Sequence, residues 1–322
     1  MMNQYQIILR RTDELSSTEW EEYTLGFNKV FKKNFTQDYF KEKYFGSSLG
    51  YSYHGALLHN GKIVGMFTVI PRQYIYSGQE VTIGLGCDAF ILKEHRKDEF
   101  FLKEMADIVT TKYVSEGIYH FVSIPNQTAY PYWIYYGGWK DIGKLNYYIV
   151  PLRISKLIGK FDFLDCISLF IFKTLINTSV LFNLLSNKTI DKSVFLKRNK
   201  EYLKQRYPSD YLIRETDDKF SFVYRVYKEE NIRTAYLIDC FPQTPRNIAI
   251  AVKQIIEETK GKVDIILFVG KIDNPPFFFP KVPEKKEPRE QPFIGISFSG
   301  QSETEFFIFD SWDVSLANFD NR

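Results

Sequence analysis

A tight hairpin followed by a strand, a helix and a strand is the feature that most restricts the fold of this chain. Two strand-like runs, Tyr51–Leu58 and Ile63–Ile70, flank Asn60-Gly61. This dipeptide favours a type I′ turn, because both of its positions need positive φ. A third run, 81–92, precedes a helical pattern and a further strand at 118–123. A strand, a helix and a strand in this order imply a right-handed crossover and a parallel pair. The sequence therefore predicts an α+β fold, a mixed and mostly antiparallel sheet with helices on both faces.

Two helices are predicted before this hairpin. Ser16 and Glu19 fit a capping box, and the aromatic residues that follow recur at helical spacing. A shorter helix is expected over 37–45, ending at Gly46. Both helices have apolar positions with which to cover the predicted sheet.

The last third of the chain repeats this order of elements. Strand-like runs at 220–227 and 234–241 precede a helix with Thr244 as N-cap and Pro245 in its first turn, and a strand at 263–269 follows. The repeated order predicts two related domains, at 1–150 and 201–322. They are joined by a helical, basic and apolar linker at 151–200.

The segment that follows the strand at 263–269 is predicted to be irregular. Six of the 13 prolines fall within residues 275–292, and proline is incompatible with regular interior structure. We expect a last strand near Glu305–Phe309, followed by a polar tail.

Charge is concentrated in the middle of the chain. Residues 1–150 carry 16 basic and 16 acidic side chains, 151–210 carry 11 and 5, and 211–322 carry 15 and 18, for a total net charge of +3. This excess is too small to indicate a nucleic-acid partner. The three isolated cysteines suggest neither disulfides nor zinc, and with no secretory signal pattern at the N-terminus we expect a cytoplasmic protein.

One stretch of the middle region is apolar nearly all round. Residues 166–185 carry Lys173 as their one charged side chain, and basic residues flank them on both sides. Such a helix is buried or lies in lipid. A helical hairpin between the domains and a peripheral membrane contact through 161–190, at the inner face of the membrane, are both compatible with the pattern.

A family resemblance rests on residues 61–145. The stretch from Gly61 to Arg96, the helix after it, Ser123-Ile124-Pro125-Asn126 and Tyr136-Gly137-Gly138-Trp139 resemble the GCN5-related N-acetyltransferase superfamily. The similarity is to its larger bacterial members, which are linked to surface-polysaccharide synthesis. It implies acetyl-CoA as co-substrate, an amine or amino-sugar acceptor, and no metal.

The resemblance places the coenzyme at one helix N-terminus. It implies coenzyme contacts from two neighbouring segments of this sequence: Ile91, Leu92, Arg96, Lys97, Glu99, Phe100 and Asn126. A helix N-terminus offers unpaired amides and partial positive charge, which suit a pyrophosphate. The turn departs from the family pattern, because Glu99 and Phe101 stand where the family has small residues.

Transfer of an acyl group from a thioester to an amine needs a base and an acid. Asp88, on the strand before the turn, is the candidate base. The family's tyrosine acid aligns with Ile134, which cannot donate a proton, and Tyr136 is the substitute we expect. Alternative readings are a catalytically degenerate binding or assembly protein of the same fold, and an aminoacyl or peptidyl transferase of the Fem type.

Overall fold

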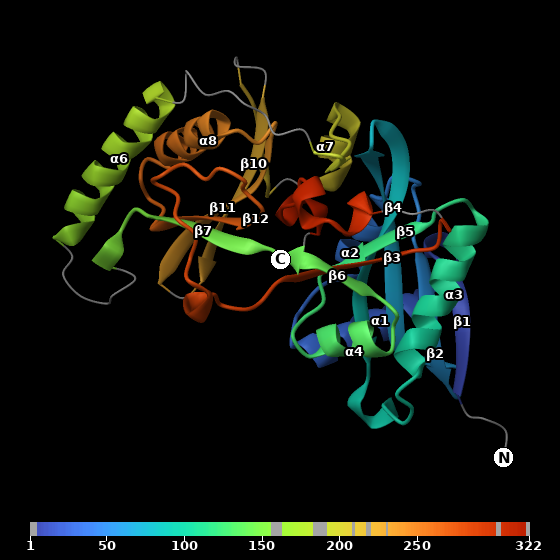
Figure 1. The fold of residues 1–322 in the computed structure, drawn as a ribbon. Helices are drawn as coiled ribbons and strands as arrows, with labels where there is room; N and C mark the ends of the chain where they lie inside the picture. Colours follow the sequence, from blue (N-terminus) through green and yellow to red (C-terminus); the bar gives the residue numbers. More distant parts are fainter. Residues whose placement is uncertain are drawn as a thin grey trace. The chain divides into compact units, whose positions relative to one another are not determined.

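The computed structural model describes residues 5–155, 163–182, 192–207, 210–216, 220–229, 231–300 and 304–319. Contacts divide the chain into two units (Figure 1). The first unit comprises residues 1–144, 193–206 and 291–312, and the second comprises 145–192, 207–290 and 313–322. This division is discontinuous and differs from the predicted boundaries at 150 and 200. Parts of the predicted linker and of the last third belong to the first unit.

The first unit is built on one sheet. Its strands are β1 (Tyr5–Arg11), β2 (Tyr53–His59), β3 (Lys62–Tyr76), β4 (Gln79–Ile91), β5 (His120–Ser123), β6 (Lys140–Lys144), β8 (Val194–Leu196) and β13 (Pro292–Ser297). The spatial order is β1-β2-β3-β4-β5-β13-β6, with β8 paired to the far part of β3. All neighbours are antiparallel except β4 and β5, which are parallel. The predicted mixed, mostly antiparallel sheet is confirmed.

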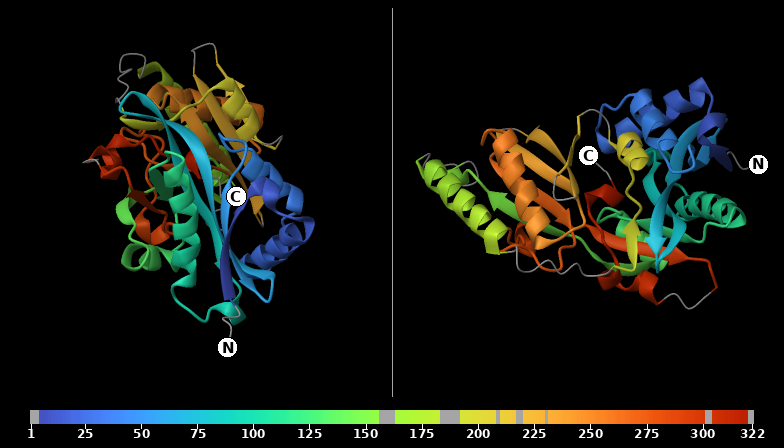
Figure 2. Two further views of the ribbon diagram at one scale, coloured as in Figure 1. Left: turned by 90° about the vertical axis from the view of Figure 1, so that its right-hand side faces the viewer. Right: turned by 90° about the horizontal axis from the view of Figure 1, so that it is seen from above.

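Helices cover both faces of this sheet. The helices are α1 (Ser17–Phe31), α2 (Gln37–Phe45), α3 (Phe101–Ser115), α4 (Ala129–Tyr135) and α7 (Lys200–Arg206), with the short turn η2 (Lys93–His95) before α3. Figure 2 shows α1 and α3 on opposite sides of the strands. Side chains alternate accordingly along β2 and β3: Leu57 and Phe67 pack in the core beneath α3, while His54 and Thr68 lie on the other face with α1 and α2.

The second unit repeats the central part of this topology. Its strands are β7 (Asn146–Pro151), β9 (Leu212–Glu215), β10 (Ser221–Glu229), β11 (Ile232–Phe241) and β12 (Ile265–Gly270), in the order β7-β12-β11-β10-β9. The crossover helix α8 (Pro245–Glu258) joins the parallel pair β11 and β12, and α6 (Leu164–Phe182) packs on α8. The predicted echo of the first half in the second is therefore present in the strand pairing.

Each unit contains one strand that pairs with a strand far from it in the sequence. The strand β13 lies between β5 and β6 in the first unit, and β7 pairs with β12 in the second. The strand β13 starts at Pro292, the last proline of the chain, so it begins where the proline-rich segment ends. We call β13 and β7 the exchanged strands. Each pairs with the second strand of a crossover, β13 with β5 and β7 with β12.

The end of the chain differs from its prediction. Residues 305–309 form no strand, and short 3-10 turns lie at η5 (Glu305–Phe307) and η6 (Phe309–Ser311). Trp312 is fully buried and donates its indole N–H to the carbonyl oxygen of Phe306 at 2.8 Å. The tail to Phe319 is buried rather than exposed, because its apolar side chains are packed among the strands of the second unit.

Candidate functional site

The parallel strands of the first unit separate at a defined point. The pairing of β4 with β5 runs from Ile83↔His120 to Gly86↔Ser123. The Ser123 hydroxyl donates to the Gly86 carbonyl at 2.8 Å and closes this ladder. Because β4 continues to Ile91 while β5 ends at Ser123, an opening between the two strands begins after Gly86. The last paired residues of the two strands are therefore Gly86 and Ser123.

A β-bulge follows in β4, two residues after Gly86. The register between β3 and β4 shifts between Met66 and Thr68, and the bulged residue Asp88 has a φ of +52°. A bulge inserts a residue that takes no part in the ladder and bends the strand. Aspartate tolerates positive φ better than most residues. The bulge therefore turns β4 away at the place where it leaves β5.

The Asp88 side chain is engaged in a buried polar network. Its Oδ2 atom is 2.7 Å from Lys43 Nζ and accepts a hydrogen bond of 2.7 Å from the Tyr44 hydroxyl. The Lys43 and Asp88 side chains are 11% and 7% exposed. The Tyr44 hydroxyl is also hydrogen-bonded to the hydroxyl of Tyr23 from α1. The network thus ties the bulge of β4 to both helices on this face.

The charges in this network stabilise one another. Burial is the largest single influence on Lys43 and opposes its charge, but the Asp88 carboxylate and further neighbouring groups together outweigh burial, and the pKa of Lys43 is raised. Burial, followed by the charge of Asp88, raises the pKa values of Tyr44 and of the Cys87 thiol. Lys43 is therefore an ammonium ion, while Tyr44 and Cys87 stay protonated. The role of Asp88 as a base stays a prediction, since Lys43, Tyr44 and the Cys87 thiol already contact its Oδ2 atom.

His54 extends the buried polar region on the same face. Its ring nitrogens lie 3.0 Å from Thr12 Oγ1 and 2.9 Å from Thr68 Oγ1. Burial lowers the pKa of His54 to about 3. Because the unfolded state takes up a proton near pH 6.5 and the folded state does not, stability is complete above pH 6.5 and decreases as the pH falls toward 3.

We expect the free energy of unfolding to fall by about 2 kcal/mol between pH 7 and pH 5 through this residue. Urea denaturation at both pH values, for the wild type and His54→Gln, measures the effect. The wild type should lose more stability than the variant between these two pH values. Equal pH dependence in wild type and His54→Gln would show that His54 titrates normally.

The amides at the N-terminus of α3 are the second part of the site. The Phe100 amide donates to Asp98 Oδ1 at 2.8 Å, and the Lys103 amide donates to the Tyr132 hydroxyl at 3.0 Å. In the part of the chain that the structure describes, the amides of 98, 99, 101 and 102 donate no hydrogen bond. Such a set of amides at a helix N-terminus favours an anion.

Glu99 and Phe101 do not fill this helix end. Glu99 is exposed and contributes its carbonyl oxygen to the Tyr132 hydroxyl at 2.7 Å, and the Phe101 ring packs against Tyr5 with a centroid distance of 5.1 Å. The two groups that do occupy amides there are the Asp98 carboxylate and the Tyr132 hydroxyl. Neither departure from the family pattern thus occupies these amides.

The other predicted coenzyme residues gather around the same turn. Arg96 Nε donates to the Ile91 carbonyl at 3.0 Å, which fixes the exposed guanidinium beside the end of β4. The Leu92 amide donates to Val64 and the Lys97 amide to His95, so neither backbone group is available to a ligand. The exposed Phe100 ring meets Tyr136 edge to face at 6.2 Å.

Two predicted residues lie on or beside α4. Tyr136 is half exposed at the C-terminal end of α4 and stacks on Tyr132 at 5.6 Å. Asn126 uses its side-chain oxygen to accept the Ala129 amide at 2.9 Å, so it caps α4. The structure therefore brings Tyr136 to the N-terminus of α3 and gives Asn126 a structural contact.

Aromatic rings close the base of the opening on the α3 face. A Cβ atom on Gly86 would lie 3.1 Å from the Phe67 ring and 3.3 Å from the Trp139 ring. Phe67, Trp133 and Trp139 are all buried, and Trp133 packs against both of the others. The opening therefore ends on a packed aromatic wall.

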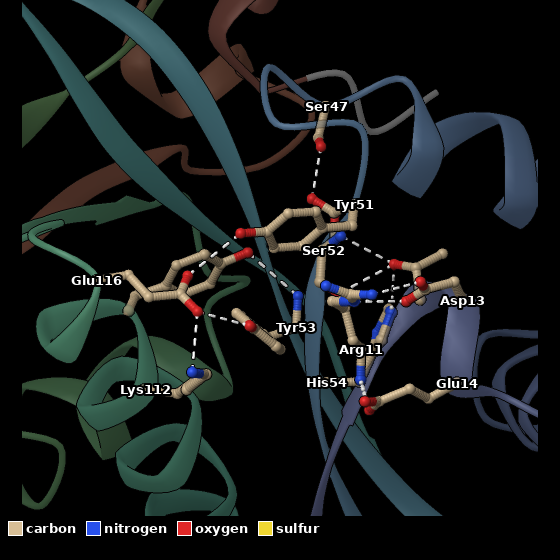
Figure 3. Close-up of polar contacts among 12 residues, drawn as sticks. Arg11, Asp13, Glu14, Ser47, Tyr51, Ser52, Tyr53, His54, Lys112 and Glu116 are labelled. Atoms are coloured by element: carbon tan, nitrogen blue, oxygen red, sulfur yellow. Dashed lines mark hydrogen bonds and ion pairs between the residues drawn. The ribbon is translucent and has the colours of Figure 1, made fainter.

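A cavity of the first unit lies away from the parted strands. Its volume is about 450 Å³, and its walls include Tyr51, Glu80, Glu116 and His120. These residues are at the amino end of β4 and the carboxyl end of α3, whereas ligands of open sheets bind beyond the carboxyl ends of parallel strands. Glu116 accepts hydrogen bonds from Tyr51 and Tyr53 and pairs with Lys112 (Figure 3). We therefore place the site at the parted strands.

The corresponding opening of the second unit is filled by the chain itself. The pairing of β11 with β12 ends at Leu237↔Phe268. Beyond it, Ser315 forms a bridge with Gly270 of β12 and donates its hydroxyl to the Ile238 carbonyl of β11 at 3.0 Å. The short turn η7 (Leu316–Asn318) follows and is buried. A coenzyme cannot occupy the same space, so the first unit contains the candidate site.

Lys43, Tyr44, Tyr23 and Tyr132 are the site residues that sequence reasoning missed or left unassigned. No local pattern pairs a helix lysine with a strand aspartate 45 positions later. The described residues contain no cluster of three or more metal-ligating side chains.

Comparison with known proteins gives the fold. No family model matches the sequence, and neither does any curated protein. A protein of unknown function from Enterococcus faecalis, described as a probable N-acyltransferase, is similar over 91% of this chain and 73% of its own, with a TM-score of 0.57 and 12% identity. A GCN5-related N-acetyltransferase from Anabaena variabilis is similar over 89% of this chain and 72% of its own, with a TM-score of 0.56 and 12% identity.

Saccharomyces cerevisiae N-myristoyltransferase with bound myristoyl-CoA is also similar. The match covers 92% of this chain and 83% of that protein, with a TM-score of 0.54 and 12% identity. At these identities the similarity concerns architecture. The chain has the acyl-CoA N-acyltransferase fold, the fold of the GCN5-related N-acetyltransferases.

Proposed function

We propose that this protein is an acyl-CoA-dependent N-acyltransferase with its coenzyme site in the first unit. The observation that supports this proposal is the opening between β4 and β5 after the pair Gly86↔Ser123. It lies beside a helix N-terminus whose amides at 98, 99, 101 and 102 donate no hydrogen bond among the described residues. The opening would accept the extended pantetheine arm. The amides, with Arg96, would bind the pyrophosphate.

The acyl group we propose is acetyl. The opening ends on Phe67 and Trp139, which lie 3.1 and 3.3 Å from a Cβ placed on Gly86. A long acyl chain would have to displace these buried rings, and closely packed interiors resist such displacement. The packed wall therefore favours a two-carbon acyl group over a fatty acyl chain.

The acceptor we propose is the amine of an amino sugar in surface-polysaccharide synthesis. Tyr135 is 80% exposed and Tyr136 is 46% exposed, at the end of α4 beside the predicted coenzyme turn. Exposed tyrosine rings offer an apolar face with a polar edge, which suits a sugar. The amine nitrogen attacks the thioester carbonyl, a C–N bond replaces the C–S bond, the amine gives up a proton, and coenzyme A leaves as a thiol.

Titration calorimetry with acetyl-CoA tests the coenzyme site. We expect saturable binding to the wild type and a roughly 10- to 100-fold weaker affinity for Arg96→Ala, because a charge-assisted contact contributes about 1.5–3 kcal/mol. Lys228→Ala, which removes an exposed lysine of β10 in the second unit, is the matched control and should leave the affinity unchanged. Myristoyl-CoA should bind no more tightly than coenzyme A itself.

The alternative is a catalytically degenerate protein that keeps the fold for binding or assembly. Asp98 and Tyr132 favour it, because they already occupy the amides of Phe100 and Lys103. It predicts no saturable heat with any acyl-CoA. Binding that appears only in Asp98→Ala or Tyr132→Phe would establish that these two side chains block the site.

A further inference from the structure

Helix α6 of the second unit is apolar on two opposite faces. Its inner face packs on the core around α8 through Leu169, Phe172, Leu175, Ile176 and Val180. Its outer face carries large apolar side chains in the exposed class. These are Phe163, just before the helix, and Ile167, Phe170, Ile171 and Leu181, with exposures of 65%, 50%, 71%, 46% and 66%. Exposed patches of this kind on a monomer mark an interaction surface. We call these five residues the outer stripe.

Of the polar side chains beside the outer stripe, two threonines already have partners, while Asn177 is exposed. The Thr174 hydroxyl donates to the Phe170 carbonyl at 3.0 Å, and the Thr178 hydroxyl donates to the Thr174 carbonyl at 2.8 Å. Burying a hydroxyl in an apolar medium is costly mainly when its hydrogen bond is lost. These two threonines therefore add little to the cost of covering the stripe with hydrocarbon.

One basic side chain borders the stripe, and two more lie close to the inner face of α6. Lys173 is exposed on α6 itself, and Lys260 and Lys262 are exposed on either side of Gly261, which lies against Leu169 of α6. The acidic residue of the helix, Asp165, is bound by the amide and hydroxyl of Ser155 at 2.9 and 2.8 Å. In the sequence, Lys156, Lys160 and Lys188 also flank the helix, at positions outside the described residues.

From this combination we infer that α6 docks on an anionic lipid bilayer and lies in the plane of its interface. Its 19 residues give an apolar stripe about 28 Å long. An apolar face bordered by lysines is typical of interfacial helices, which bury that face at the boundary between headgroups and acyl chains. Phe170 and Ile171 enter the hydrocarbon, and the ammonium groups contact lipid phosphates.

Docking in the plane fits α6 better than crossing the membrane. Among the described residues α6 is long and apolar enough to cross a bilayer by length and composition. Its inner face, however, is part of the core that α8 and the second sheet form. Crossing would remove that face from the core, whereas an interfacial helix keeps the inner contacts and exposes only the outer stripe to lipid.

Vesicle sedimentation of the full-length protein tests this inference. We expect binding to phosphatidylglycerol/phosphatidylcholine vesicles, weaker binding in high salt, and little binding to phosphatidylcholine alone. The double variant Phe170→Glu/Ile171→Glu should bind the anionic vesicles at least tenfold more weakly. Leu25→Glu/Ile308→Glu adds the same two charges at exposed apolar positions of the first unit and should bind as the wild type does. Circular dichroism checks that each variant is folded.

Four results would overturn the inference. The first is absence of binding to anionic vesicles, and the second is an equal loss in both double variants. The third is a wild-type dimer that Phe170→Glu/Ile171→Glu converts to a monomer, since a second copy of the chain would then cover the stripe. Protein that stays in the vesicles after an alkaline carbonate wash would show insertion across the bilayer and would also contradict docking in the plane. None of these outcomes depends on acyltransferase activity.

Discussion

Replacing Lys43 with methionine is expected to lower the free energy of unfolding by about 3–5 kcal/mol. The ammonium group is 2.7 Å from Asp88 Oδ2, and both side chains are nearly buried. Methionine removes the countercharge and leaves a buried carboxylate with the Tyr44 hydroxyl and the Cys87 thiol as its neutral donors. Urea denaturation at pH 7 measures the loss.

A double-mutant cycle separates the ion pair from simple packing. Asp88→Asn keeps a residue that tolerates the positive φ of the bulge. The variant Lys43→Met/Asp88→Asn should recover part of the stability that Lys43→Met loses, because no unpaired charge remains. A loss below about 1 kcal/mol for Lys43→Met would mean that solvent screens the pair as it does at a surface.

The same Asp88→Asn variant tests the predicted base. If Asp88 removes the proton of the amine, turnover should drop by about 10² to 10⁴ while acetyl-CoA affinity is retained. If turnover and stability fall together in both Lys43→Met and Asp88→Asn, Asp88 acts by positioning the bulge.

Gly55→Ala is expected to cost about 3 kcal/mol or more. The Cβ atom would lie 2.2 Å from the carbonyl oxygen of Met105, and backbone atoms of α3 cannot rotate away as a side chain can. Helix α3 would have to move off β2, and its N-terminus carries the proposed pyrophosphate site. Thermal denaturation and acetyl-CoA titration should therefore show a loss of both stability and affinity.

Gly86→Ala is the matched control for this substitution. Its Cβ would meet the ends of the Phe67 and Trp139 rings at 3.1 and 3.3 Å. Side chains can shift by the few tenths of an ångström required, so we expect a stability change within about 1 kcal/mol. Equal destabilisation by the two substitutions would show that α3 is not in close contact with β2.

Local signals predicted the elements well. Asn60 and Gly61 have φ values of +51° and +77°, as their turn requires. Ser16 and Glu19 form the predicted capping box, and Thr244 caps α8 with Pro245 in its first turn. These features were predictable because each depends on residues within one turn of chain.

The arrangement of the site was not predictable in the same way. The contact of Lys43 with Asp88 and that of Tyr132 with the α3 amides depend on how distant elements pack. The strand β13 follows a proline-rich segment, and its six residues carry no signal for insertion between β5 and β6. Burial of the C-terminal tail likewise depends on an opening between β11 and β12 that only the folded unit creates.

The exchanged strands also affect how the chain matures on the ribosome. When β5 leaves the exit tunnel, the strand that will cover its edge lies about 170 residues downstream, roughly 10–30 s away at ordinary rates of synthesis. During that interval the nascent sheet exposes an edge that invites pairing with other chains. Chaperone protection is most valuable in this interval, and release from the ribosome with β13 in place ends the exposure.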